Sequence, residues 1–129
     1  MHTIKILLVD DEPDFLKIIG ERIRGWGYGL ITAGNGVKAI ELVKSEKPDV
    51  VILDYMMPEM DGLAALKKIR KTAKKMPVIM FTAFPDNAIK GAKKLGVDAF
   101  IPKLSEYADT TTSLKASLEL IIKRLKNKK

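Results

Sequence analysis

The sequence predicts a doubly wound α/β fold, a five-stranded parallel sheet of order 2-1-3-4-5 with helices on both faces. Short apolar runs alternate five times with stretches of helical spacing, which favours an open α/β sandwich with right-handed crossovers. The runs are continuous rather than alternating with polar residues, as expected of strands that are buried on both faces. Five such units in 129 residues are too few for an eight-unit barrel.

Each apolar run predicts a strand, and the runs are three to six residues long. Pro48 and Pro77 come just before the third and fourth runs, where a strand is about to begin. The runs lie at residues 4–9, 28–32 (the weakest), 50–53, 78–81 and 99–101.

The helices are predicted where apolar residues recur every three or four positions. Pro13 suits a first helical position and Gly25 suits a helix end. Asn35-Gly36 is interpreted as a loop that enters the second helix, and the polar stretch 105–113 as one that precedes the last. The five stripes are Leu16, Ile19, Ile23 and Trp26; Val37, Ile40 and Val43; Leu63, Leu66, Ile69 and Ala73; Ala88, Ala92 and Leu95; and Leu114, Leu118, Ile121, Ile122 and Leu125.

Composition limits the class of protein. The 23 basic and 16 acidic residues give a net charge of +7, and the basic residues cluster at 62–85 and in a tail at about 123–129. The absence of cysteine excludes disulfides and thiolate zinc sites. Neither a signal peptide nor an apolar run near the ~20 residues of a membrane helix is apparent. We therefore expect one cytoplasmic domain that spans residues 1–129.

Chemically active residues follow the predicted strands. Asp10 and Asp11 end the first strand, Asp54 the third and Thr82 the fourth, and Lys103 follows the fifth. In an open parallel sheet these carboxyl ends lie at one edge, where sites form. In isolation Asp10 and Asp11 could equally cap a helix, and Thr82 and Lys103 could be ordinary surface residues. Their combination favours a site.

The three aspartates repel one another and call for a cation. At 4 Å a like-charge pair costs about 4 kcal/mol at an effective dielectric near 20. Either a bound Mg²⁺ ion or the Lys103 ammonium could offset this repulsion. With the charge balanced, the Asp54 carboxylate could attack phosphorus while Lys103 and the Thr82 hydroxyl neutralise the phosphoryl oxygens.

These residues, with the run Asp54-Tyr55-Met56-Met57-Pro58-Glu59-Met60-Asp61-Gly62, Thr82-Ala83 and Lys103, resemble the receiver domain of two-component response regulators. The resemblance covers residues 3–127 and implies a flavodoxin-like fold, in the manner of a stand-alone chemotaxis regulator. It implies that Asp54 takes a phosphoryl group from a sensor kinase phosphohistidine. It also implies that Asp11, Asp54 and the Met56 carbonyl hold Mg²⁺, with Asp10 assisting through water.

The resemblance implies a switch as well. Thr82 and Lys103 would bind the phosphoryl group, and Phe100 would be the aromatic switch residue. Phosphorylation would then remodel the surface of helix four, strand five and helix five. Met56 and Phe84 would flank the phosphoryl group without orienting a water molecule, so we expect slow dephosphorylation.

Function alternatives remain at this stage. Leu104 stands where the family has proline after the lysine, so a phosphorylation-independent binding module stays open. A Mg²⁺-dependent phosphohydrolase would need a second acid two residues after Asp54, where Met56 stands.

The expected partners are a sensor histidine kinase or phosphotransfer protein and an unknown downstream protein. We expect no DNA-binding domain, no membrane, and a monomer or a weak phosphorylation-dependent dimer.

Overall fold

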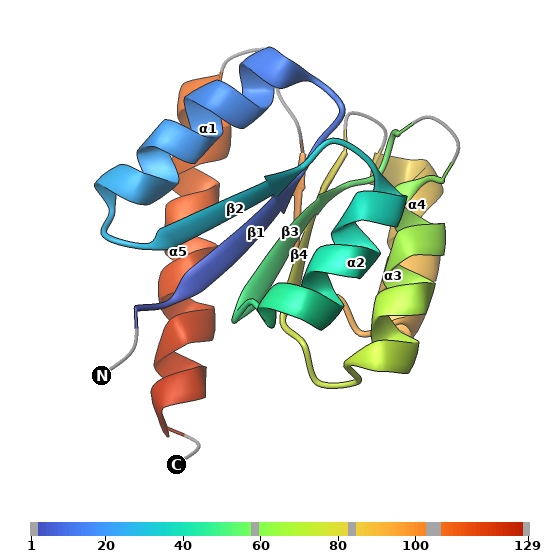
Figure 1. The fold of residues 1–129 in the computed structure, drawn as a ribbon. Helices are drawn as coiled ribbons and strands as arrows, with labels where there is room; N and C mark the ends of the chain where they lie inside the picture. The colour runs from blue at the N-terminus through green and yellow to red at the C-terminus, as the bar shows by residue number, and fades with distance from the viewer. Residues whose placement is uncertain (1–2, 58–59, 83–84, 103–106, 128–129) are drawn as a thin grey trace.

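A computed structural model shows a parallel sheet between two layers of helices. The structure describes residues 3–57, 60–82, 85–102 and 107–127. The elements run in the order β1 (Lys5–Val9), α1 (Pro13–Gly25), β2 (Gly29–Ala33), α2 (Gly36–Glu46), β3 (Val50–Asp54), α3 (Gly62–Thr72), β4 (Val78–Thr82), α4 (Pro85–Lys94), β5 (Ala99–Pro102) and α5 (Tyr107–Asn127). Helices α1 and α5 cover one face of the sheet, and α2, α3 and α4 cover the other (Figure 1).

The sheet order is β2-β1-β3-β4-β5, with every neighbouring pair parallel, which confirms the predicted topology. Strand β1 pairs with β2 and with β3, so it lies between them. In the β1–β3 pair, Val9 lies opposite Leu53. The residues that follow these two strands therefore emerge next to each other.

Successive strand residues point to opposite sides of the sheet, and both sides are buried. Ile6 and Leu8 of β1 pack into the core beneath α1 and α5. Leu7 and Val9 pack into the core beneath α2, α3 and α4. All four side chains are buried, which explains why the strand sequences are continuous apolar runs.

Side-chain caps fix the starts of α2 and α3, whereas α5 begins earlier than predicted. The Asn35 side chain caps α2 by accepting from Lys38 N at 2.8 Å, and Asp61 caps α3 by accepting from Ala64 N at 2.9 Å. Helix α5 begins at Tyr107, so most of the polar stretch 105–113 is helical rather than a connection. Thr110 is buried in this first part of α5, where tertiary packing outweighs modest helix propensity.

Arg70 ties α3 to the end of α4. Its Nε donates to Leu95 O at 2.7 Å and its two terminal nitrogens donate to Gly96 O and Met76 O, at 2.9 and 2.5 Å. Burial lowers the pKa of the Arg70 guanidinium, against an opposing effect of Asp98. The guanidinium thus donates hydrogen bonds to backbone carbonyls and fixes the two helices relative to each other.

Among the described residues, no helix has the length and apolar character to cross a bilayer.

Candidate functional site

Asp10 and Asp54 lie at adjacent strand ends on one edge of the sheet. Asp10 directly follows β1, and Asp54 is the last residue of β3. The sheet ladder continues past both strands, because Asp10 N donates to Ala33 O at 3.1 Å and Tyr55 N to Phe81 O at 2.8 Å. Both carboxylates are almost fully buried, at 0% and 2% exposure. A buried acid needs a hydrogen bond or a cation to offset its loss of solvation, so this edge of the sheet is a candidate functional site.

An acidic cluster surrounds Asp10. One carboxylate oxygen from each of Asp10, Asp11 and Glu12 lies within 4.8 Å of the others. Glu12 N donates to Asp10 Oδ1 at 2.8 Å, which holds the Asp10 carboxylate in place. Asp11 and Glu12 are exposed, so the cluster opens toward solvent. An ion could therefore reach it.

The loop after β3 fixes Asp54 from the other side. Met56 N makes a long hydrogen bond of 3.4 Å to Asp54 Oδ1. Gly62 N donates to Tyr55 O at 2.8 Å, which closes the loop at the start of α3. A Cβ atom on Gly62 would lie 2.6 Å from Asp54 O and 2.7 Å from Tyr55 Cα. Only glycine lets α3 approach the backbone of the Asp54 segment this closely.

The donor set fits Mg²⁺. The described cluster offers carboxylate oxygens from Asp10, Asp11 and Glu12, and Asp54 is not a member of it but lies at the neighbouring strand end. Hard oxygen donors, a few of them charged, with room for water are what Mg²⁺ prefers. A divalent cation would also offset the mutual repulsion of the carboxylates.

Some predicted site residues lie wholly or partly outside the described part of the chain. Lys103 and Phe84 are outside it, as is the side chain of Thr82. The Thr82 backbone ends β4 opposite Pro102, one position beyond the residue that pairs with Asp54. Phe100 lies opposite Met80 in β5 and is half-buried against the core beneath α3 and α4.

Two residues that matter to the site were not predicted. Glu12 belongs to the acidic cluster, although only Asp10 and Asp11 were expected to contribute to it. Its position in the run Asp10-Asp11-Glu12 was the available signal. Gly62 sits against the Asp54 backbone; it ends the sequence run that carries the resemblance, but no role was predicted for it.

The response regulator receiver domain model matches residues 6–115, and the chain therefore belongs to the response regulator receiver family. A probable transcriptional regulator ycf27 of Guillardia theta is 45% identical over 101 residues, which cover 77% of this chain and 39% of that protein. The transcriptional regulatory protein PhoP of Bacillus subtilis, which acts in alkaline phosphatase synthesis, is 33% identical over 115 residues, covering 88% and 48%. Receiver domains are signalling domains, and the predicted family and fold are both confirmed.

Solved structures agree. A receiver domain protein from Clostridium thermocellum has a TM-score of 0.84 and 30% identity, with 95% of this chain and 96% of that chain covered. The response regulator TrrA of Thermotoga maritima, solved in complex with Mg²⁺ and BeF, has a TM-score of 0.76 and 31% identity, with 88% and 97% covered.

The partner prediction is wrong in one respect. We expected no DNA-binding domain, with output only through another protein. The chain spans 39% and 48% of the two relatives above and 53% of a third, from Porphyridium aerugineum, all of them described as transcriptional regulators. In those proteins the receiver is one part of a longer regulator, so the absence of a DNA-binding domain does not follow from the receiver sequence.

Proposed function

We propose that the chain is a phosphoacceptor that takes a phosphoryl group on the Asp54 carboxylate from a phosphohistidine of a sensor kinase. The observation that carries this proposal is the position of Asp54. It is buried at a strand end beside Asp10, with Met56 N donating to Oδ1. A carboxylate needs no general base to act as a nucleophile.

The transfer step is an in-line displacement at phosphorus. A bond forms between an Asp54 carboxylate oxygen and phosphorus as the bond from phosphorus to the donor imidazole nitrogen breaks. The bonding electrons stay on that nitrogen, which takes up a proton. The Asp54 backbone is held by the β3–β4 ladder, so the nucleophile is preorganised for this approach.

Asp10, Asp11, Asp54 and the Met56 carbonyl would hold Mg²⁺, and Glu12, which clusters with Asp10 and Asp11, could add a ligand. Bound Mg²⁺ supplies positive charge that offsets the carboxylates and the phosphoryl oxygens. Thr82 and Lys103 follow the neighbouring strands, where a hydroxyl and an ammonium would bind the same oxygens. Movement of Phe100 on phosphorylation would then change the surface formed by α4, β5 and α5.

The function of any longer protein is a further part of this proposal. The relatives described as transcriptional regulators support an output on transcription, with residues 1–129 as the phosphorylated unit of a cytoplasmic regulator. In this arrangement phosphorylation shifts the population between two receiver conformations, and the receiver controls whatever domain or partner it contacts.

The experiment is intact-mass spectrometry after incubation with acetyl phosphate, a small phosphodonor, with and without Mg²⁺. We expect the mass to rise by one phosphoryl group with Mg²⁺ and to stay unchanged with a chelator, because the ion offsets the charge of the carboxylates. Equal incorporation in both samples would contradict the proposed role of the acidic cluster. An unchanged mass in both would contradict the phosphoacceptor proposal.

Replacing Met56 with Asn is expected to shorten the lifetime of the phosphorylated protein about tenfold, because an amide orients an attacking water that a thioether does not. The Met56 side chain is 50% exposed beside Asp54, so the substitution should leave the core intact. Leu120→Asn, at another exposed apolar residue on α5, is the matched control and should not change the lifetime. Phosphate release measures both; equal rates in Met56→Asn and the parent protein would contradict the prediction.

A further inference from the structure

Helices α3 and α4 lie side by side and form one rigid surface. A Cβ atom on Gly91 of α4 would lie 2.9 Å from Leu63 Cδ1 of α3, so the two helices are in close contact there. At the other end, Arg70 donates to the carbonyls of Leu95 and Gly96. Side chains next to this seam therefore keep a fixed spacing from one helix to the other.

The seam is strongly basic. From residue 62 to residue 97 the sequence has eight lysines and one arginine but a single acid, Asp86. All eight lysines are exposed. Among the described residues the ion pairs lie elsewhere, at Lys5–Glu46, Lys38–Glu41, Lys115–Glu119 and Arg124–Asp98.

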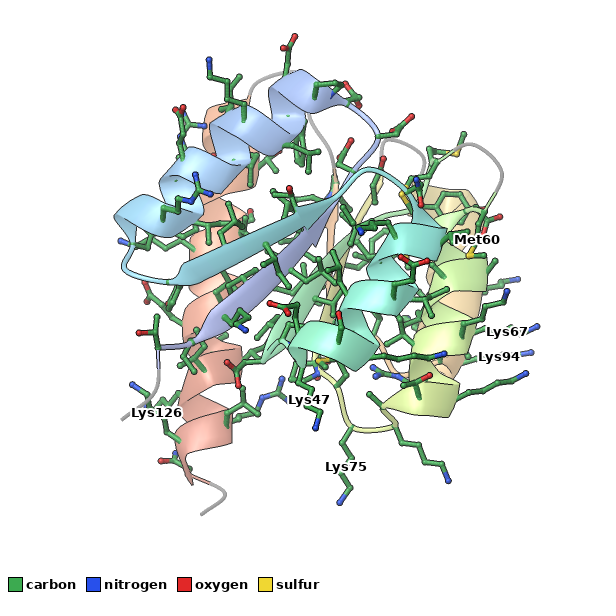
Figure 2. All side chains as sticks on the ribbon, in the orientation of Figure 1. Lys47, Met60, Lys67, Lys75, Lys94 and Lys126 are labelled. Carbon is green, nitrogen blue, oxygen red and sulfur yellow. The ribbon has the colours of Figure 1, made fainter. Side chains whose placement is uncertain are left out.

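Five of these lysines lie near the seam. Leu63 and Arg70 mark the side of α3 that meets α4, and Lys67 lies between them in the same helical stripe. Lys74 lies in the turn that follows the end of α3 at Thr72. Figure 2 shows Lys67 and Lys94 extending from the molecule in the same direction. We call Lys67, Lys71, Lys74, Lys90 and Lys94 the basic seam.

The chemistry of the seam fits a phosphate backbone better than a protein surface. Protein interfaces depend on buried aromatic and apolar anchors and are depleted in lysine. The large apolar residues exposed in the described part of the chain, Val37, Met56 and Leu120, all lie off the seam. Non-specific binding to a phosphate backbone comes from Lys and Arg charges that neutralise phosphates and release counterions.

The one arginine at the seam cannot read bases. Sequence-specific contacts to guanine use a free arginine or lysine fork in the major groove. The Arg70 guanidinium is occupied by main-chain carbonyls, and burial lowers its pKa. The lysines that remain are contacts that position a protein on DNA without specifying sequence.

We propose that the basic seam binds the phosphate backbone of duplex DNA without sequence preference. This binding surface is separate from Asp54 and does not depend on the phosphoacceptor function. If all five lysines each neutralise one phosphate, log K against log salt has a slope of about −4 to −5. The dissociation constant expected at physiological salt is about 10⁻⁴ to 10⁻⁶ M, as for other non-specific binders.

The test uses fluorescence anisotropy of the full chain with a labelled short duplex and a scrambled duplex, at salt concentrations from about 50 to 200 mM. We expect equal affinity for both sequences and the slope given above. The triple variant Lys67→Gln, Lys71→Gln and Lys94→Gln should weaken binding at least tenfold and reduce the slope by about 3 units. Circular dichroism and thermal unfolding establish that the variants fold.

The matched control removes the same charge elsewhere. Lys17, Lys44 and Lys123 are exposed on α1, α2 and α5, and their triple change to Gln leaves the same net charge as the seam variant. The control should keep most of the affinity. Equal weakening by both triple variants would show that binding depends on net charge alone. That result would overturn the proposal that the basic seam is the binding surface.

Two further outcomes separate the alternatives. Poly-L-glutamate that binds the seam more tightly than the duplex, with the same dependence on the lysines, would assign the surface to acidic proteins and overturn the proposal. Asp54→Asn should bind the duplex as tightly as the parent chain. Failure of DNA binding with normal phosphorylation, or the reverse, therefore distinguishes the two proposals.

Discussion

An Asp54→Asn variant is expected to take up no phosphoryl group from acetyl phosphate while it keeps its fold. The amide of Asn is not a nucleophile toward phosphorus, whereas the Asp54 carboxylate lies buried and held at a strand end. Removing one of two buried like charges relieves its repulsion with Asp10, so the free energy of unfolding should not fall. Intact mass after incubation with Mg²⁺ and acetyl phosphate measures the first effect and urea unfolding the second.

The control for this variant is Asp61→Asn in the same loop. Asp61 caps α3 through its Oδ1, which accepts from Ala64 N, and asparagine caps helices as well as aspartate does. This variant should incorporate a phosphoryl group to the same extent as the parent chain. Incorporation in Asp54→Asn equal to that in Asp61→Asn would mean that another side chain is the acceptor.

Replacing Gly62 with Ala is expected to destabilise the protein by about 3 kcal/mol and to slow phosphorylation at least tenfold. The added methyl group would meet Asp54 O at 2.6 Å and Tyr55 Cα at 2.7 Å, both of them backbone atoms that no rotamer change can move. The start of α3 must shift away, and the Asp54 segment shifts with it. Urea unfolding and the rate of mass increase with acetyl phosphate measure the two effects.

Gly25→Ala provides the comparison for a glycine that has space. No atom lies within 4 Å of a Cβ at Gly25, the last residue of α1, so alanine should stabilise by about 0.5–1 kcal/mol. Phosphorylation should proceed at the parent rate. A Gly62→Ala variant as stable as Gly25→Ala would show that the α3 start is not held against the Asp54 segment.

The parts of the fold that could be predicted depend mostly on local sequence patterns, namely apolar runs and helix caps. Strand β3 reads as an unbroken apolar run because both of its faces are covered, and the same reason applies to β1 and β4. Caps at Asn35 and Asp61 place helix starts to the residue. The acids that follow β1 and β3 were predicted to meet because parallel strand ends share an edge, and Asp10 and Asp54 do lie there.

What could not be predicted depends on contacts between distant residues. The first part of α5 has no apolar stripe, and it is helical with Thr110 buried by its tertiary surroundings. Arg70 reads as one more basic residue of a lysine-rich helix, yet it hydrogen-bonds to carbonyls up to 26 residues away. Gly62 reads as an ordinary helix start, and only the three-dimensional approach of α3 to Asp54 requires it.

The central claim is that the chain forms an acyl phosphate on one particular carboxylate. The most direct measurement is reduction of the phosphorylated protein with borohydride, which converts an acyl phosphate of aspartate to homoserine, followed by peptide mass spectrometry. We predict homoserine at position 54, next to Tyr55, only in samples treated with both Mg²⁺ and acetyl phosphate. Homoserine at position 10 or 11, or none in any sample, would contradict the claim.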